Sequence, residues 1–381
     1  MRLLLPGLID GHVHLREPGL THKGDMETET RSALAGGVTT VCDMPNTVPP
    51  TVTVDALRDK VERAERITDC DIRFFFGVTK PEHLEELWRA AADARLRPRL
   101  CGVKCFLDHS TGNQGVEENL LEEAFKSCAE LGLVAACHCE DPAINARAKE
   151  AETATDIATH SRMRPPTSEA AAVRSAITLA REHGTKLHIA HLSTRGGLAL
   201  VRAAKGEGVS VTCEAAPHHL FLTVDDYAVL GAFGKMNPPL RTGEDRDALW
   251  AGIADGAIDC IATDHAPHMR EEKQAGDPLS APSGVPGVET MLPLLLTVAA
   301  GGWPHPSSQR PDTRLAIEDI VRLCFENPNR IFHLGRKEGD VSIEVDPEKE
   351  WVIHGKDLHA KCGWTPYEGW RVKGKVTRVV R

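Results

Sequence analysis

Residues 3–14 read LLLPGLIDGHVH, a short apolar run that ends in two histidines separated by one residue. In an extended strand the side chains at positions i and i+2 point to the same side, so His12 and His14 would present two imidazoles to one point in space. Arg16 follows with the same parity. This arrangement is typical of metal ligands, but a pair of surface or core histidines is the more common origin of so short a pattern. The metal interpretation depends on whether the rest of the chain supplies further ligands.

Seven more short runs rich in Val, Ile, Phe and Cys follow the first, and amphipathic segments separate them. The predicted strands cover 3–9, 38–43, 72–78, 101–106, 133–138, 187–191, 209–214 and 258–263. Each is apolar nearly throughout, as expected of strands that are buried on both faces. The intervening helices are predicted at 25–35, 54–66, 82–94, 117–131, 167–183, 195–205 and 244–254.

Eight strands that alternate with helices predict an α/β protein, a parallel (β/α)8 TIM barrel. A doubly wound open sheet is the less favoured alternative, because no glycine-rich dinucleotide motif follows the first strand. After residue 338 the pattern changes to short alternating segments, which predict a small C-terminal antiparallel β appendage. We therefore expect a barrel over residues 1–338 and the appendage over 339–381.

The composition excludes some classes of function. Acidic residues outnumber basic ones by 55 to 45 in 381 residues, and this net charge of −10 argues against a nucleic-acid partner. No apolar stretch reaches the length of a membrane span, so no membrane association is expected. The eleven cysteines lack the paired spacing of zinc fingers and are expected to be buried free thiols in a reducing compartment, with the cytoplasm as the default location.

Residues of the ligand type recur where the predicted strands end, and in a barrel these ends share one rim. They are His12, His14, Lys104, His138, His191 and Asp264. Each has an ordinary explanation by itself, such as a core histidine or a helix cap. Their joint occurrence on separate strands predicts a metal site with nitrogen and oxygen donors.

Lys104 needs a chemical explanation, because a buried lysine without a partner is costly. Between two divalent cations its ammonium form is disfavoured, whereas the neutral amine can react with carbon dioxide to give a carbamate. The carbamate has two oxygens and can bridge two metals that share and activate a water molecule. The donors favour zinc, although manganese and cobalt remain open.

Several motifs together resemble those of dihydroorotases in the amidohydrolase superfamily. The match extends over nearly the whole chain, and its motifs are Pro6–Gly19, Asp43–Thr47, Ala216–Leu222, Asn237–Arg241, Thr263–His268, Pro286–Pro293, Asn327–Phe332 and Trp364–Gly369. The resemblance implies a distorted barrel. It also implies that the β appendage, which relatives build from both termini, is reduced here, because the chain begins almost at its first strand.

The resemblance also implies a binuclear site with two Zn²⁺ per chain, bridged by N6-carboxylated Lys104. His12, His14 and Asp264 would hold one ion, and His138 and His191 the other. The implied reaction is the reversible hydrolysis of L-dihydroorotate to N-carbamoyl-L-aspartate in pyrimidine biosynthesis. A hydroxide between the metals would attack the ring amide, with Asp264 as general base and acid.

Substrate contacts are implied in the same way. Arg16, Asn46 and His268 would bind the substrate carboxylate, which suits a guanidinium, an amide and an imidazole. Asn237 and the backbone near Gly287 would contact the ring.

The segment 108–115 follows the Lys104 strand and is either a loop that closes over the site or an ordinary turn. If it closes, Thr111 or Asn113 is expected to contact the substrate.

Two alternatives remain open. One is a related cyclic-amide hydrolase, namely a hydantoinase, dihydropyrimidinase or allantoinase, which would not need the three carboxylate-binding residues together. The other is a non-catalytic scaffold, which is disfavoured because all six ligand positions are present. The expected partners are a small-molecule substrate and a second copy of the chain in a homodimer, and the sequence leaves association with an aspartate transcarbamoylase open.

Overall fold

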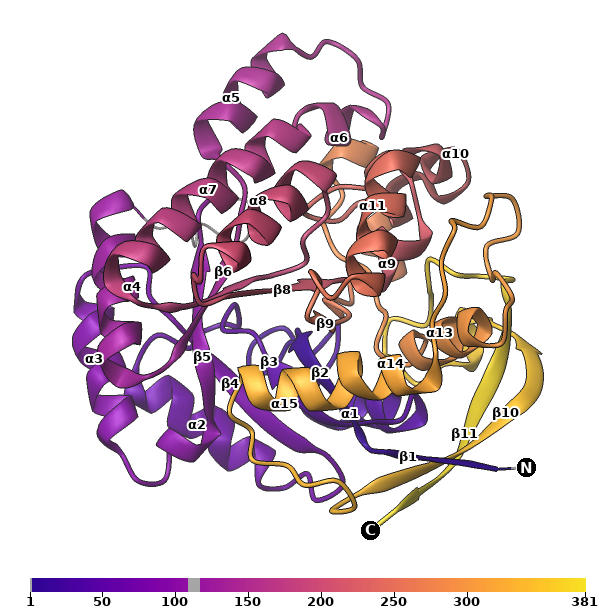
Figure 1. The fold of residues 1–381 in the computed structure, drawn as a ribbon, viewed down its shortest axis with the longest axis horizontal. Helices are drawn as coiled ribbons and strands as arrows, with labels where there is room; N and C mark the ends of the chain where they lie inside the picture. Colours follow the sequence, from indigo (N-terminus) through magenta and orange to yellow (C-terminus); the bar gives the residue numbers. More distant parts are fainter. Residues whose placement is uncertain (1, 109–116) are drawn as a thin grey trace.

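The computed structural model describes residues 2–108 and 117–381, and its centre is a parallel eight-stranded sheet (Figure 1). The strands follow one another in chain order from β2 to β9. They are β2 (Leu8–Val13), β3 (Val38–Asp43), β4 (Asp71–Gly77), β5 (Leu100–Phe106), β6 (Val134–His138), β7 (Lys186–Ile189), β8 (Val211–Ala215) and β9 (Cys260–Ile261). A parallel bridge between Val13 and His265 joins the two edges of the sheet. The predicted (β/α)8 barrel is confirmed.

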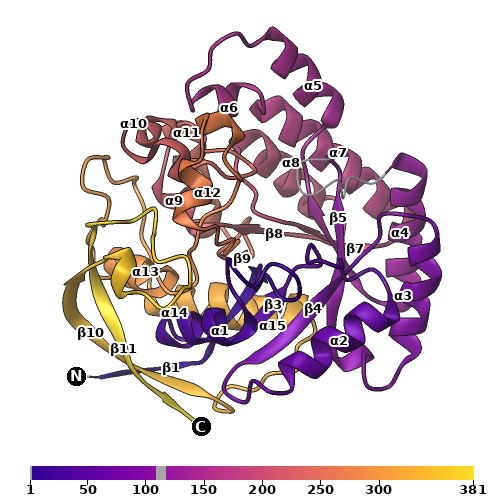
Figure 2. The same ribbon diagram turned by 180° about the vertical axis from the view of Figure 1, so that it is seen from behind.

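Helices connect the strands and cover the outside of the barrel (Figures 1 and 2). They are α1 (Met26–Ala35), α2 (Val54–Ala64), α3 (Glu82–Ala92), α4 (Glu118–Leu131), α7 (Pro166–His183), α8 (Arg195–Gly206), α11 (Gly243–Ala254) and α13 (Met291–Ala299). The first seven lie close to where the sequence predicts them, whereas the eighth was not predicted. Gly132 and Gly184 end α4 and α7 in the left-handed conformation that glycine adopts at little cost.

A second, three-stranded antiparallel sheet packs beside α13 and contains both ends of the chain (Figure 1). Its strands are β1 (Leu3–Pro6), β10 (Ser342–Val352) and β11 (Arg371–Val380), in the order β1-β10-β11. The predicted C-terminal β segments are therefore confirmed as a small appendage. The N-terminal strand also belongs to this sheet, so the predicted single strand over 3–9 is wrong.

The chain passes from one sheet to the other at Gly7. The Gly7 amide donates to Val341 O beside β10, whereas the Leu8 amide donates to Gly37 O at the start of the barrel. A Cβ at Gly7 would lie 2.2 Å from Oγ1 of Thr39, so only glycine fits between the two sheets. The apolar run 3–9 thus contains parts of two strands. The point at which they separate depends on contacts with distant residues.

Several short elements lie between the barrel strands and helices. They are α5 (Pro142–Ala151), α6 (Thr159–Arg162), α9 (Pro217–Phe221), α10 (Tyr227–Leu230), α12 (Arg270–Gln274), α14 (Ile317–Val321) and α15 (Asn327–Ile331). Phe332, directly after α15, packs edge-on against Phe75 in the barrel interior. In the described parts of the chain, no helix combines the length and apolar character needed to cross a membrane. All eleven cysteines are buried and unpaired, as the sequence predicts.

Candidate metal centre and active site

A cavity of about 340 Å³ lies at the carboxyl ends of the barrel strands. Its wall contains all six predicted metal ligands and four of the predicted substrate contacts. These residues are His12, His14, Arg16, Asn46, Lys104, His138, His191, Asn237, Asp264 and His268. Residues that are up to about 250 positions apart in sequence thus meet in one cavity, as the strand-end argument predicts.

His12, His14 and Asp264 form one cluster of ligand-type side chains. Their ligand atoms all lie within 4.8 Å of one another. Oδ1 of Asp264 is 3.3 Å from Nε2 of His12 and 3.0 Å from Nε2 of His14. Burial lowers the pKa of His14 to about 4, with Arg16 and His12 acting in the same direction. The imidazole is therefore neutral at physiological pH and keeps a lone pair for a metal.

Glu214, at the end of β8, holds the ring of His12 from behind. Its Oε1 is 2.5 Å from Nδ1 of His12 and also accepts the amide of His191 at 3.0 Å, while its Oε2 is 3.1 Å from Nε2 of His188. Burial raises the pKa of Glu214, but its contacts with His12 and His188 outweigh burial and hold the pKa below its ordinary value. An ionised Glu214 fixes the proton of His12 on Nδ1, so Nε2 faces the cavity as an acceptor.

Sequence reasoning missed Glu214, although a signal was present. It is an acidic residue at the end of an apolar strand, the same position that singled out His138. His188, on β7, also contacts Glu214 and does not line the cavity.

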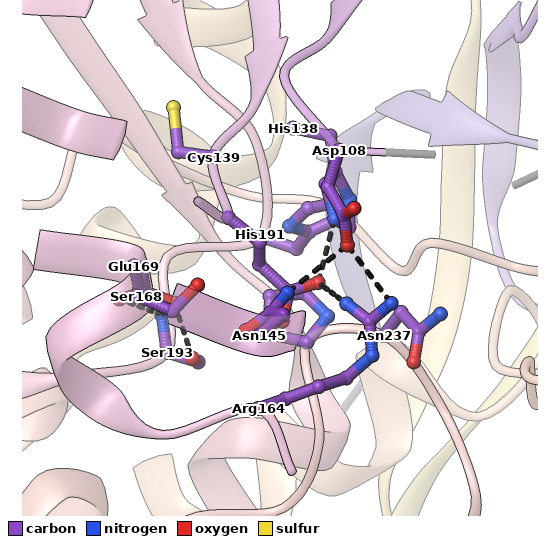
Figure 3. A network of polar contacts seen from close by, with 12 residues as sticks. Asp108, His138, Cys139, Asn145, Arg164, Ser168, Glu169, His191, Ser193 and Asn237 are labelled. Atoms are coloured by element: carbon purple, nitrogen blue, oxygen red, sulfur yellow. Dashed lines mark hydrogen bonds and ion pairs between the residues drawn. The ribbon is translucent and has the colours of Figure 1, made fainter. Parts of the chain in front are cut away.

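His138 and His191 form a second cluster in the same cavity (Figure 3). Nδ1 of His138 lies 3.0 Å from Nε2 of His191, and Nε2 of His138 lies 2.7 Å from Oε2 of Glu140. Glu140 is fully buried and pairs with Arg164, which in turn contacts Asp108 at 3.0 Å. No sequence pattern marks these contacts, because Arg164 lies outside every strand.

Lys104 projects into the same cavity from β5. It is 1% exposed, and its Nζ has no hydrogen-bond partner among the described residues. Burial lowers the pKa of this amine. Nδ1 of the buried His191 is equally without a partner among those residues. Unpaired polar atoms are expensive in an apolar interior, so this donor set fits a bound metal centre.

Three residues of the site have left-handed backbone conformations although none is glycine. The φ angles are 66° at Arg16, 34° at His191 and 46° at Asp264. Such conformations cost on the order of 1–3 kcal/mol each and persist where the surrounding structure enforces them. The strain is concentrated where side chains must leave a strand end and turn into the cavity.

Arg16, Asn46 and His268 lie on one side of the cavity. Nε of Arg16 donates to Pro267 O at 3.0 Å, and one terminal nitrogen lies 3.2 Å from Nε2 of His268. Oδ1 of Asn46 is 2.7 Å from Nδ1 of His14. Burial lowers the pKa of His268, and the charges of Arg16 and Lys23 lower it further. A fixed guanidinium beside a neutral imidazole and an amide is a suitable receptor for a carboxylate.

Two buried lysines hold the segment 281–284, which forms another part of the cavity wall. Nζ of Lys235 donates to Leu279 O at 2.5 Å and to Ala281 O at 2.6 Å. Nζ of Lys273 donates to the carbonyl oxygens of Lys235, Pro282 and Gly284 at 2.9, 2.9 and 3.2 Å. These contacts are the main restraints on a wall that contains no strand.

One expected substrate contact lies elsewhere in the described structure, and two others are not tested by it. Gly287 does not line the cavity, because its amide donates to Nδ1 of His265 at 3.1 Å and the segment 281–284 occupies the wall instead. Thr111 and Asn113 lie outside the described residues.

Comparisons with known proteins agree with this geometry. Residues 3–343 match the profile of the Amidohydrolase family. A dihydroorotase from Halobacterium salinarum is 44% identical over 96% of this chain and 82% of its own length, and one from Methanosarcina mazei is 39% identical over 96% and 80%. Among solved structures, an L-hydantoinase (dihydropyrimidinase) from Arthrobacter aurescens superposes with a TM-score of 0.90 at 28% identity, covering 100% of this chain and 84% of that one.

Proposed function

This chain belongs to the amidohydrolase family, and we propose that it works as a dihydroorotase through the residues described above. It is a hydrolase that acts on a cyclic amide, and its reaction interconverts L-dihydroorotate and N-carbamoyl-L-aspartate in pyrimidine biosynthesis. The observation that carries the assignment is one cavity that combines a histidine–aspartate–lysine cluster with the carboxylate receptor of Arg16, Asn46 and His268.

The cofactor in this proposal is a pair of Zn²⁺ ions bridged by N6-carboxylated Lys104. His12, His14 and Asp264 would hold one ion and His138 and His191 the other. Support comes from the unpartnered Nζ of Lys104 and Nδ1 of His191 and from the close approach of the first three ligands. When bound, the ions supply Lewis acidity and lower the pKa of water.

Asp264 is the proposed general base and acid. Burial raises the pKa of its carboxyl group, but the neighbouring His12 and His14 outweigh burial and hold the pKa well below its ordinary value. The ionised carboxylate therefore accepts a proton from the attacking water and delivers it to the ring nitrogen that leaves. Arg16, Asn46 and His268 bind the α-carboxylate and fix the position of the ring during this transfer.

The alternative within the family is a hydantoinase, dihydropyrimidinase or allantoinase, which the structural likeness to a hydantoinase keeps in consideration. The substrates of these three enzymes lack the ring carboxylate of dihydroorotate. Arg16 is 6% exposed and has a strained backbone, a costly arrangement for a residue without a ligand to bind. This cost favours dihydroorotase.

Parallel assays with dihydroorotate, hydantoin, dihydrouracil and allantoin test the assignment. We expect turnover of dihydroorotate, and Arg16→Lys should lower its kcat/KM about 100-fold because lysine lacks the bidentate fork. Turnover of only the other three compounds would refute the assignment. An inactive, metal-free protein would instead support a non-catalytic scaffold.

Three further parts of the proposal rest on sequence expectations. We propose a barrel unit over 1–338 with an appendage over 339–381, a cytoplasmic location and a homodimer. Buried unpaired cysteines support the location, since they suit a reducing compartment. Sedimentation of the purified protein tests the dimer. An aspartate transcarbamoylase partner is left out of the proposal.

A further inference from the structure

His160 lies on α6, outside every motif that the sequence singled out, and is buried beside the cavity. Its Nε2 lies 3.0 Å from the backbone oxygen of Met236 and 2.9 Å from Oδ1 of Asn237. A backbone carbonyl can only accept a hydrogen bond, so Nε2 must carry a proton. The same N–H then requires an acceptor from Asn237, which is its side-chain oxygen.

The N–H of His160 alone fixes the orientation of the Asn237 amide, with the side-chain oxygen toward His160. With Oδ1 bound to His160, the amino group must point elsewhere. Asn237 lines the active-site cavity, and no hydrogen bond holds its Nδ2 among the described residues. Its amino group is therefore available to donate to a molecule bound in the cavity.

The surroundings of His160 keep its imidazole neutral and hold α6 in place. Burial, together with the charges of Arg164 and Lys235, lowers its pKa to about 3. The neighbouring Ser161 bonds to Leu240 O at 2.9 Å, which ties α6 to the same segment that carries Asn237. The fold thus fixes the positions of His160 and Asn237 independently of the hydrogen bond between them.

We propose that His160 is a positioning residue, which makes Asn237 offer its amino group to a carbonyl oxygen of the bound ligand. This inference rests on the proposed function, and the natural acceptor is the ureido carbonyl oxygen, which dihydroorotate and N-carbamoyl-L-aspartate both carry. A buried histidine thereby determines that this wall selects an acceptor rather than a donor.

A double-mutant cycle tests the proposal. His160→Phe removes the donor while keeping a ring, and we expect the KM for dihydroorotate to rise about tenfold with little change in kcat, since one oriented hydrogen bond is lost. Asn237→Ala should have a similar effect, and the double variant should be no worse than Asn237→Ala alone. His160→Gln retains an N–H donor and should recover most of the affinity.

The matched control is Arg162→Gln, on the same short helix but paired with Glu152 and Asp156 at the surface, which should leave KM unchanged. A merely structural role for His160 predicts multiplied effects in the double variant, and that result would overturn the proposal. An unchanged KM in His160→Phe would do the same. Failure of the wild type to turn over dihydroorotate would instead refute the proposed function.

A measurement that needs no variant covers the case in which His160→Phe does not fold. In a structure of the zinc-loaded wild type with N-carbamoyl-L-aspartate, we expect Nδ2 of Asn237 at hydrogen-bond distance from the ureido oxygen. An Asn237 that turns its Oδ1 to the ligand, or that makes no contact with it, would contradict the proposal.

Discussion

The cavity has two sides that are built in different ways, which we call the rim and the wall. The rim consists of the predicted metal ligands, most of which stand on or directly after barrel strands and two of which are braced by the buried acids Glu214 and Glu140. The wall consists of residues 235–237 and 281–284, which are held by donors that reach backbone carbonyls. The rim owes its geometry to the sheet, whereas the wall owes its geometry to individual side chains.

This difference implies that the two sides fail differently. A change in the rim should remove metal or proton transfer while the barrel stays folded, because the strands do not depend on the ligands. A change in the wall should leave metal binding intact and affect substrate affinity or local stability. The experiments below therefore distinguish metal binding and proton transfer on the rim from substrate affinity and stability on the wall.

The largest effect is expected at Asp264, where the rim performs the proposed proton transfer. Asp264→Asn keeps the shape of the side chain but cannot accept a proton, so kcat should fall about 10³-fold. Metal content by atomic emission and the melting temperature show whether the fold survives. Asp55→Asn is the control, since that carboxylate is 90% exposed and does not line the cavity. A fall of less than tenfold would remove Asp264 from its proposed role.

Glu214 tests how the rim is braced. Glu214→Gln weakens the hydrogen bond that fixes Nδ1 of His12, and loss of such a support typically lowers metal affinity 10- to 100-fold. Competition with a chelator measures the affinity. The KM of the fully metal-loaded variant should stay near the wild-type value, because the wall is untouched. A changed KM with unchanged metal affinity would break the distinction between rim and wall.

Sequence alone predicts the rim well, for a physical reason. A strand buried on both faces must be apolar, so a polar residue at its end stands out, as His138 and Lys104 do. The division at Gly7 could not be predicted, because both strands of the run 3–9 are apolar and only distant partners separate them. The wall was equally hidden, since His160 meets Asn237 across 77 positions and no periodic pattern marks the contact.

Replacing Lys273 tests how the backbone of the wall is held. Its ammonium group is 1% exposed and satisfies three backbone carbonyls, so Lys273→Met would leave three buried acceptors without a donor. The free energy of unfolding should fall by about 2 kcal/mol. Metal content should be unchanged, and KM should rise because the segment 281–284 loses its main restraint. Chemical denaturation measures the first effect, and loss of metal from the variant would contradict the separation of the two sides.

The smallest effect is expected in the pH dependence of stability. Burial lowers the pKa of His160 from 6.5 to about 3, so below pH 6.5 the unfolded chain binds a proton that the folded chain refuses. The contribution of His160 to stability is complete above pH 6.5 and is lost as the pH falls toward 3, by up to about 1.4 kcal/mol per pH unit. His160→Gln removes this loss. The melting temperatures of wild type and variant should therefore converge between pH 6.5 and 5, while Ser161→Ala, which changes no titratable group, should keep a constant offset from wild type. Parallel pH curves for wild type and His160→Gln would mean that the imidazole of His160 is protonated in the folded protein. The wall would then carry a third cation beside Arg164 and Lys235, on the side of the cavity that must bind an anionic substrate.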